Sequence, residues 1–453
     1  MVLLAVGATW FGRRPLAEFS IRRYLAANGV PAQIRAEQVG GNTLVFDDVR
    51  LGPHDAPDLV ARRITLTLGG TPLKTHVTAI RLDGTLLRIR LRDGGVSFGS
   101  LDRLIPAGRS TRFPAVAVTV VDGTTLIDTP AGALLGRIAA GGRLDRDFRA
   151  TLRTIPASLQ AAGCRGLAGP IAVVLTTAAT DFAVRAGGGV DAAGCAAAAT
   201  PRLDWTATLR APISLARLTA RVDARLAPLT AGPVAAGAPS RLRIDAAGPP
   251  DRLGGTWHLA SAQVGVGRDV AATVAADGRF DWSKGSPVAV AGTLAAGRLA
   301  TPSLAAALAM PPGLPAVVAA LLDRAASATR TLDLRATFAA ALGEQIAAHV
   351  TSADATGAGG ARFRFAGDAA AGTAGQTATV GGRLAWSGGG LPGGHLDVAH
   401  LGPASAGWRG SGRLTLAPWR AGDGIIAVRG AGFDLAGGDL VTSGRVLLSS
   451  AFA

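Results

Sequence analysis

The sequence has little of what a densely packed enzyme core uses. Only 5% of its 453 residues are aromatic, Tyr24 is the single tyrosine, and lysine occurs only at Lys74 and Lys284. Much of the 48% hydrophobic content is alanine, and 62 residues are glycine. Such thin side chains suit a slender sheet better than a thick, interlocked core.

The motifs of the common enzyme and metal-site classes are also missing. There is no P-loop, dinucleotide fingerprint, H-E-x-x-H segment or EF-hand loop, and the six histidines are scattered. Residues 95–99 match the G-x-S-x-G pattern of hydrolases around Ser97, but they follow an Asp-Gly-Gly turn rather than a strand. We therefore interpret Ser97 as part of a turn that enters a strand. We expect that the protein is not an enzyme and that it binds neither a metal nor a cofactor. An envelope hydrolase is the third-ranked hypothesis for the function.

The formal net charge is +15, from 46 basic and 31 acidic residues. A basic surface suits nucleic acid, anionic lipid or simple solubility. Many arginines stand singly between apolar residues, as Arg88 and Arg90 do, and no aromatic residues are interleaved to stack on bases. The charge pattern therefore argues against a nucleic-acid partner.

Two cysteines, Cys164 and Cys195, are 31 positions apart and belong to no C-x-x-C or Cys/His spacing. This argues against a zinc site. In an oxidising compartment the pair would form one disulfide, whereas in the cytosol both would be buried thiols.

What the sequence does contain is a sustained alternation of apolar and polar residues, interrupted by Gly, Asp-Gly or Pro. A period of two places alternate side chains on opposite faces of a strand. Asp83–Gly84 and Asp122–Gly123 are typical of hairpin turns between such strands. With a turn every 10–15 residues, the pattern predicts an all-β fold: a long, curved, open antiparallel sheet of about 30 strands.

Such a sheet has one apolar face, and little else in the sequence is available to cover it. The residues that we expect on this face near the N-terminus are Ile64, Leu66, Leu68, Leu87, Ile89, Leu91, Val116, Val118 and Val120.

The first twelve residues are apolar and precede Arg13 and Arg14. A membrane span needs about 20 residues, and the stretch lacks the leading charge and the cleavage site of a signal peptide. We interpret residues 1–12 as part of a membrane anchor, with an ordinary buried segment as the alternative. Its expected membrane-facing residues are Leu3, Leu4, Val6, Trp10 and Phe11. Residues 13–30 follow as a short amphipathic helix that begins at Pro15.

A second helix is predicted at residues 311–330, where apolar residues recur at helical spacing from Leu314 to Leu322. It would either lie across the sheet or join two sections, at residues 31–310 and 331–453. The last residues still alternate like a strand. We therefore expect either that the chain continues beyond them or that another chain pairs with this edge.

Several segments resemble the YdbH family of Gram-negative envelope proteins, relatives of AsmA and TamB. The resemblance is carried by Ile34–Val39 leading to Asp47–Gly52, by Ile80–Arg88, by Asp93–Asp102, and by Leu126–Gly132 and Ala325–Arg335. It covers essentially the whole chain, although family members are about twice as long.

The resemblance implies an inner-membrane-anchored, periplasmic β-groove that conducts phospholipids toward the outer membrane. The apolar residues named above would then face lipid. It also implies a partner at the C-terminal end, such as a small outer-membrane lipoprotein or another envelope protein. The alternative is a structural or adhesin-like β-solenoid, which would have a dry interior and a stricter repeat than this chain has.

Overall fold

A computed structural model describes most of the chain. The described residues are 2–71, 76–92, 95–104, 111–161, 164–193, 202–231, 234–266, 268–302, 316–343, 345–372, 379–404, 407–421, 424–436 and 439–450. The fold is mostly β, with 72% strand, an open mixed sheet and few helices, as predicted from the alternation. The chain divides into two compact units, Met1–Ala224 and Arg225–Ala453.

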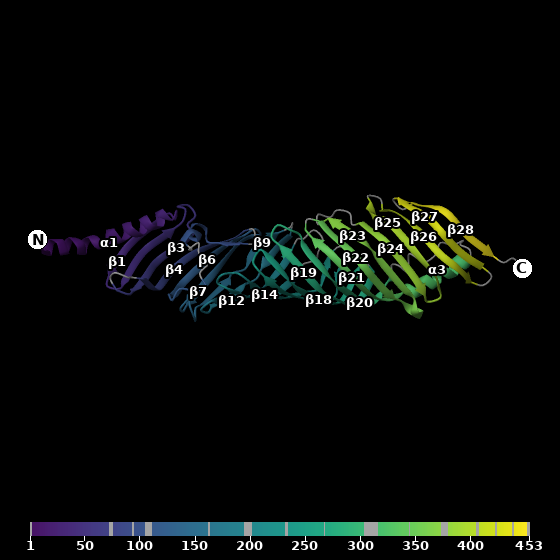
Figure 1. The fold of residues 1–453 in the computed structure, drawn as a ribbon, viewed down its shortest axis with the longest axis horizontal. Helices are drawn as coiled ribbons and strands as arrows, with labels where there is room; N and C mark the ends of the chain where they lie inside the picture. Colours follow the sequence, from purple (N-terminus) through teal and green to yellow (C-terminus); the bar gives the residue numbers. More distant parts are fainter. Residues whose placement is uncertain are drawn as a thin grey trace. The chain divides into compact units, whose positions relative to one another are not determined.

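The first unit begins with a helix and continues as strands (Figure 1). Its elements are α1 (Val2–Ala27), β1 (Ala32–Gly40), β2 (Thr43–Leu51), β3 (Leu59–Gly69), β4 (His76–Arg92), β5 (Gly95–Ser97), η1 (Gly99–Leu104), β6 (Ala117–Thr129), β7 (Gly132–Gly141), β8 (Arg149–Thr154), β9 (Ala157–Ala161), β10 (Cys164–Ala168), β11 (Ala172–Thr177), β12 (Asp181–Ala193), β13 (Arg202–Pro212) and β14 (Leu218–Leu226), the last two residues of which belong to the second unit.

Neighbouring strands of this unit pair in the order β1, β2, β3, β4, β6, β7, β8, β11, β12, β13. All these pairings are antiparallel except that of β4 with β6, which is parallel. The sequence predicted an antiparallel sheet throughout. The exception arises because β6 begins at the end of the sheet where β4 begins, after the chain has passed through β5 and η1. The two strands therefore run in the same direction.

The second unit is mainly a meander, in which β17 to β28 each pair with the next strand. Its elements are β15 (Leu229–Ala231), β16 (Val234–Ala236), β17 (Ser240–Gly248), β18 (Arg252–Val266), β19 (Asp269–Ser283), β20 (Val288–Ala300), α3 (Ala316–Thr329), β21 (Thr331–Leu342), β22 (Gln345–Thr356), η2 (Ala358–Gly360), β23 (Arg362–Gly372), β24 (Thr379–Gly388), β25 (Leu391–Ala404), β26 (Gly407–Ala421), β27 (Gly424–Ala436) and β28 (Asp439–Ser450).

Two predicted hairpin turns are wrong: Asp83–Gly84 and Asp122–Gly123 lie inside the long strands β4 and β6. Gly84 and Asp122 do take the left-handed conformation that a hairpin turn would use, with φ of 61° and 53°. Because they are aligned across the β4–β6 pair, they bend both strands at one level instead of reversing them. Asp48 of β2, with φ of 52°, lies at the same level.

Helix α1 is one continuous helix, whereas the sequence predicted an anchor at residues 1–12 and a separate helix starting at Pro15. Pro15 lies inside the helix, so the loss of one backbone hydrogen bond there does not end it. Among the described residues, no helix combines the length and the hydropathy of a membrane span. The proposed anchor side chains, Leu3 to Phe11, lie outside the part of the chain whose side chains are described.

The predicted internal helix is confirmed as α3, although Leu314 lies outside the described residues. The helix connects β20 to β21 in sequence but contacts β25, β26, β27 and η2. The structure therefore has α3 lying against the sheet. A division of the sheet at residues 311–330 stays a prediction.

We predict that Gly84→Ala destabilises the protein by about 1–2 kcal/mol, because an L side chain is disfavoured in the left-handed conformation. An added Cβ would also lie 3.1 Å from the Arg62 Cβ. Gly141→Ala is the matched control, since its added Cβ meets nothing within 4 Å. Denaturant unfolding of both variants measures the effect; equal stability of the two would contradict the bend at Gly84.

Candidate functional site

Cross-strand pairing in the second unit aligns apolar side chains into continuous rows. Residues directly opposite each other in a sheet share a face, so a chain of pairs defines one row. One row crosses eleven successive strands, from β17 to β27, without a polar residue. Its members are Leu242, Leu259, Ala276, Leu294, Ala336, Ala353, Phe365, Leu384, Leu396, Leu414 and Ala431.

A parallel row combines large side chains with glycines. It lies two positions further along each strand, or three in β22, where a register shift separates Val350 from Ala353. Its members are Ile244, Trp257, Gly278, Gly292, Phe338, Val350, Gly367, Gly382, Val398, Gly412 and Phe433. The glycines make room for the rings: a Cβ on Gly292 would lie 2.8 Å from the Trp257 ring, and one on Gly412 would lie 2.6 Å from the Phe433 ring. The Trp257 and Phe338 rings have centroids 6.2 Å apart.

A third apolar row lies on the other side of the first. It is two positions away along each of its strands, or three in β27, where a register shift separates Val428 from Ala431. Its members are Val274, Ala296, Leu334, Ala355, Phe363, Trp386, Gly394, Leu416 and Val428. At a strand spacing of about 4.8 Å, the eleven-strand row extends for about 48 Å, and the three rows together span roughly 13 Å along the strands. This apolar surface is large for one that no described second sheet covers.

The opposite face of the same strands is polar. One row there reads Arg243, His258, Asp277, Thr293 and Thr337. Arg364 Nε lies 2.6 Å from Asp354 Oδ1, and the hydrogen bond from the Arg383 guanidinium holds the pKa of Asp397 below its ordinary value. In β21 the side chains alternate between exposed polar residues such as Asp333 and half-buried apolar ones. In the described strands named here, the charged side chains therefore lie on the face opposite the apolar rows.

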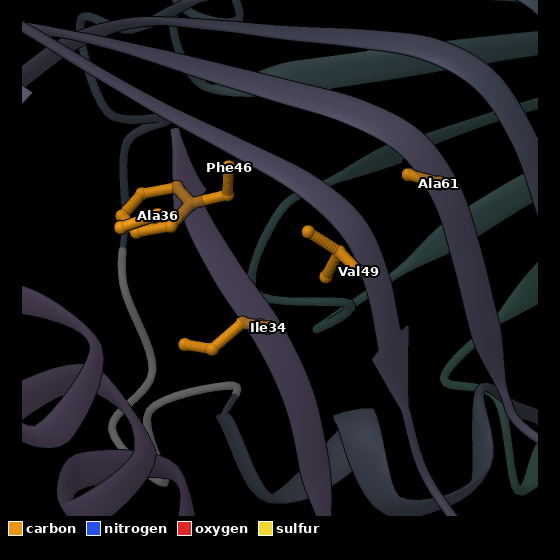
Figure 2. Packing of buried hydrophobic residues seen from close by; sticks show 5 residues of the cluster. All are labelled: Ile34, Ala36, Phe46, Val49 and Ala61. Carbon is orange, nitrogen blue, oxygen red and sulfur yellow. The ribbon is translucent and has the colours of Figure 1, made fainter. Parts of the chain in front are cut away.

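The first unit carries an equivalent row across ten strands. Its members are Ala36, Phe46, Ile64, Leu82, Val120, Ala140, Ala150, Leu175, Val184 and Leu209. The row begins in a small cluster of buried side chains on β1, β2 and β3, where the Phe46 ring lies beside Ala36 (Figure 2).

The nine residues predicted for the apolar face separate into groups. Ile64 and Leu66 pack against the cluster of Figure 2, whereas Ile89 packs against a second buried cluster of Ile127, Leu134 and Ala168. The others are placed by their strand partners: Leu68 opposes Val77, Leu87 opposes Leu59 and Thr125, Val118 opposes Ile80, and Val120 opposes Leu82.

The last two of the nine lie at strand ends. Leu91, near the end of β4, opposes Val96 of β5 and is 36% exposed. Val116 precedes β6, and its carbonyl accepts a hydrogen bond from the Leu144 backbone N–H.

Sequence reasoning missed the rows of the second unit, because alanine and glycine fill many of their positions. The signal was present in the alternation at Leu332, Leu334, Ala336 and Phe338, but the cross-strand register that joins such strands is not visible in the sequence.

Sequence reasoning also missed a buried ion pair in the first unit, between Asp58 and Arg90, which we call the lock. Asp58 is 1% exposed, and its Oδ1 lies 2.7 Å from Arg90 Nη1, while its Oδ2 accepts hydrogen bonds from the Ser100 N–H and Oγ–H. Burial opposes the ionisation of Asp58, but these Ser100 and Arg90 contacts outweigh it and hold its pKa below the ordinary value. The lock ties η1 to the loop before β3.

Ser97 belongs to the same connection. Its Oγ donates to Asp102 Oδ2 at 2.6 Å and accepts from the Gly99 N–H at 3.1 Å. Neither described contact involves a histidine, so the geometry is that of a turn that begins η1. Ser97 ends the short strand β5 instead of entering a strand as predicted, and the 3-10 helix η1 follows it, whereas a nucleophile elbow has a long helix after the serine.

A shallow groove of about 810 Å³ opens in the second unit. Half of its lining residues are alanine, and the lining includes His349 and Asp368, whose Nδ1 and Oδ1 atoms are 2.6 Å apart. Within the described residues, no group of three or more His, Cys, Asp or Glu residues is placed to hold a metal ion. The side chains of Cys164 and Cys195 lie outside the described part, so their disulfide stays a prediction.

Open sheets with one long apolar face are suited to contact with apolar molecules. Comparison with protein families decides the point, because residues 1–432 match the YdbH-like family, described as intermembrane phospholipid transport protein YdbH. The chain belongs to the YdbH-like family. This family transports lipid and is not a family of enzymes.

No curated protein and no solved structure matches this YdbH-like chain. The family assignment therefore rests on the family match, and the fold on the strand pairing described above.

We predict that Asp58→Asn destabilises the first unit by roughly 2–4 kcal/mol at neutral pH, because the Arg90 guanidinium loses its partner. Since the pKa of Asp58 is lowered in the folded state, its contribution is complete above the unfolded pKa of about 3.9 and is lost as the pH falls through the folded pKa. The difference from wild type should therefore shrink in acid.

Unfolding curves of wild type and variant at neutral and acidic pH measure this dependence. Asp55→Asn, an exposed carboxylate in the same loop, is the matched control and should change stability by less than about 0.5 kcal/mol. A pH-independent difference for Asp58→Asn would contradict the lock.

Proposed function

We propose that the chain conducts phospholipids between two membranes by sheltering their acyl chains on the apolar faces of its sheets. The observation that carries the proposal is the row of apolar side chains that crosses eleven strands in register. The family match names the cargo class. Head groups would remain in water while the acyl chains lie along the rows.

Moving an acyl chain from water to such a face gains roughly 0.8 kcal/mol per methylene group. Because every member of each row is apolar, neighbouring positions offer similar apolar surfaces in series. A lipid can then move from one position to the next without meeting a position that binds it much more tightly than its neighbours. Neither covalent chemistry nor a cofactor is needed for this passive movement.

The proposed location is the cell envelope, with the N-terminus attached to the inner membrane and the sheets in the periplasm. The apolar residues 1–12 support an attachment at this end. At the C-terminal end, the proposed partner is a small outer-membrane lipoprotein or another envelope protein. The proposal draws on β28, whose described strand partner is β27, since unpaired backbone groups of a strand accept an added strand.

The mechanism predicts that a single charge on an apolar row blocks transport. Phe338→Asp places an unpaired carboxylate on a row of the second unit, and Ile89→Asp places one on the predicted apolar face of the first unit, beside Ile127 and Leu134. An unpaired carboxylate costs several kcal/mol in an apolar setting. Transport should fall about tenfold or more in each variant. Ala339→Asp is the matched control for the first, since Ala339 is the next residue of β21 and is exposed on the opposite face, beside His349.

A growth assay in cells that depend on this protein, with protein abundance measured in parallel, compares these variants with Ser97→Ala. Ser97→Ala should leave transport intact, because it removes only hydrogen bonds within a turn. If Ser97→Ala abolished growth while both charged row variants were tolerated, the conduit would be refuted and a hydrolase would have to be considered.

A further inference from the structure

Helix α3 lies on the third apolar row where that row crosses β26 and β27. Leu416 and Val428, two members of the row that oppose each other, are 9% and 3% exposed, and Ile426, on the same face of β27, is 5% exposed. No other leucine, isoleucine, valine, phenylalanine or tryptophan described in the second unit is buried. Val274 and Leu334, members of the same row on β19 and β21, are only half-buried. Because α3 contacts β25, β26 and β27, we attribute the additional burial to the helix.

One side of α3 is apolar and the opposite side is polar. At about 100° per residue, four half-buried apolar side chains fall within an arc of about 100°. They are Val318, Leu321, Leu322 and Ala325. The exposed residues fall within an arc on the opposite side, and they are Asp323, Arg324 and Ser327. The helix therefore presents to the sheet the same kind of apolar surface that an acyl chain would present.

Hydrogen bonds fasten α3 at its C-terminal end. The Thr301 hydroxyl donates to the Thr329 carbonyl, and the Thr301 N–H donates to the Arg330 carbonyl at 3.1 Å. Both threonines are buried. Within the part of the helix whose side chains are described, residues 318–324 have no hydrogen bond or ion pair with the sheet. One end of α3 is therefore fixed, whereas the remainder is held by apolar contact, which has no preferred direction.

We propose that α3 is a hinged cover for the part of the apolar face that lies on β26 and β27. It lies on these strands while they hold no lipid, and it turns away about its C-terminal end when acyl chains take its place. This inference rests on the proposed function and adds a regulation of the same site. Because this part of the face contacts either the helix or an acyl chain, lipid shifts the equilibrium toward the open position. In the closed position the helix shields apolar surface from water.

A photo-crosslinking side chain at residue 428 of the full-length chain tests this exchange. A second chain carries it at residue 259, a half-buried position of the eleven-strand row on β18. Protein freed of lipid by detergent is illuminated with and without vesicles of phosphatidylethanolamine and phosphatidylglycerol. Without vesicles, residue 428 should form an adduct with α3 of the same chain. With vesicles, the yield of that adduct should fall at least threefold while lipid adducts form at residues 428 and 259.

Two results would overturn the hinged cover. If residue 259 captured lipid while residue 428 kept its adduct with α3 at an unchanged yield, the helix would be a fixed wall. If residue 428 captured lipid without losing that adduct, the lipid would lie beneath a static helix. Lipid at neither position would count against the conduit itself, so a failure of the proposed function is recognised separately.

Two neighbouring residues of α3 supply a matched pair of variants. Leu322→Ser weakens the apolar contact with the sheet, whereas Asp323→Ser changes an exposed residue on the polar side. Leu322→Ser should therefore raise the yield of lipid adducts at residue 428 at least threefold, and Asp323→Ser should leave it unchanged. The same yield in both variants would contradict the competition between helix and lipid.

A reversible crosslink tests the movement without altering the apolar side of α3. An added Cβ on Gly390 would lie 3.1 Å from Arg324 Cδ, so a short cleavable reagent can join Arg324→Cys to Leu391→Cys. The native Cys164 and Cys195 are replaced by serine in this chain and in its uncrosslinked control. The crosslinked chain should lose lipid adducts at residue 428 and keep them at residue 259, and cleavage should restore the former. Undiminished lipid capture at residue 428 before cleavage would refute the hinge.

Discussion

The structure depends on one constraint: strands satisfy their backbone groups by pairing sideways, and pairing does nothing to cover their faces. In the second unit, β17 to β28 pair in simple succession, so every added strand extends both faces. One face carries arginine and aspartate pairs that water solvates. The other carries rows of apolar side chains, and among the described elements only α3 lies across part of this unit's sheet. The part of the apolar face that α3 does not contact is suited to be covered by another apolar molecule.

Glycine and left-handed residues shape these faces without interrupting the rows. Gly84 and Asp122 bend β4 and β6 at one level, and cross-strand glycine pairs such as Gly278 with Gly292 leave room for the Trp257 ring. The scarcity of aromatic residues follows from the same design. A surface that holds mobile acyl chains needs continuity more than the interlocked packing of a globular core.

The sequence was sufficient for the strand-rich fold and for the presence of an N-terminal and an internal helix, because each depends on a local period. It was insufficient at Asp83–Gly84, where a positive φ serves equally for a turn or a bend, and at the parallel β4–β6 pair, which depends on how distant segments meet. The lock of Asp58, Arg90 and Ser100 was invisible for the same reason, since Asp58 and Ser100 are 42 positions apart. A row such as the one that contains Leu384 becomes visible only when the cross-strand register of eleven strands is known.

The central claim is that the apolar faces hold phospholipid, and mass spectrometry of the lipids bound to the purified full-length chain tests it most directly. The account predicts several phospholipids per chain, removed by detergent and regained from vesicles in amounts that fall when Leu294 and Leu384 are both replaced by Asp. A chain that carries no phospholipid after gentle extraction, or whose bound lipid is unchanged by those two replacements, would contradict it.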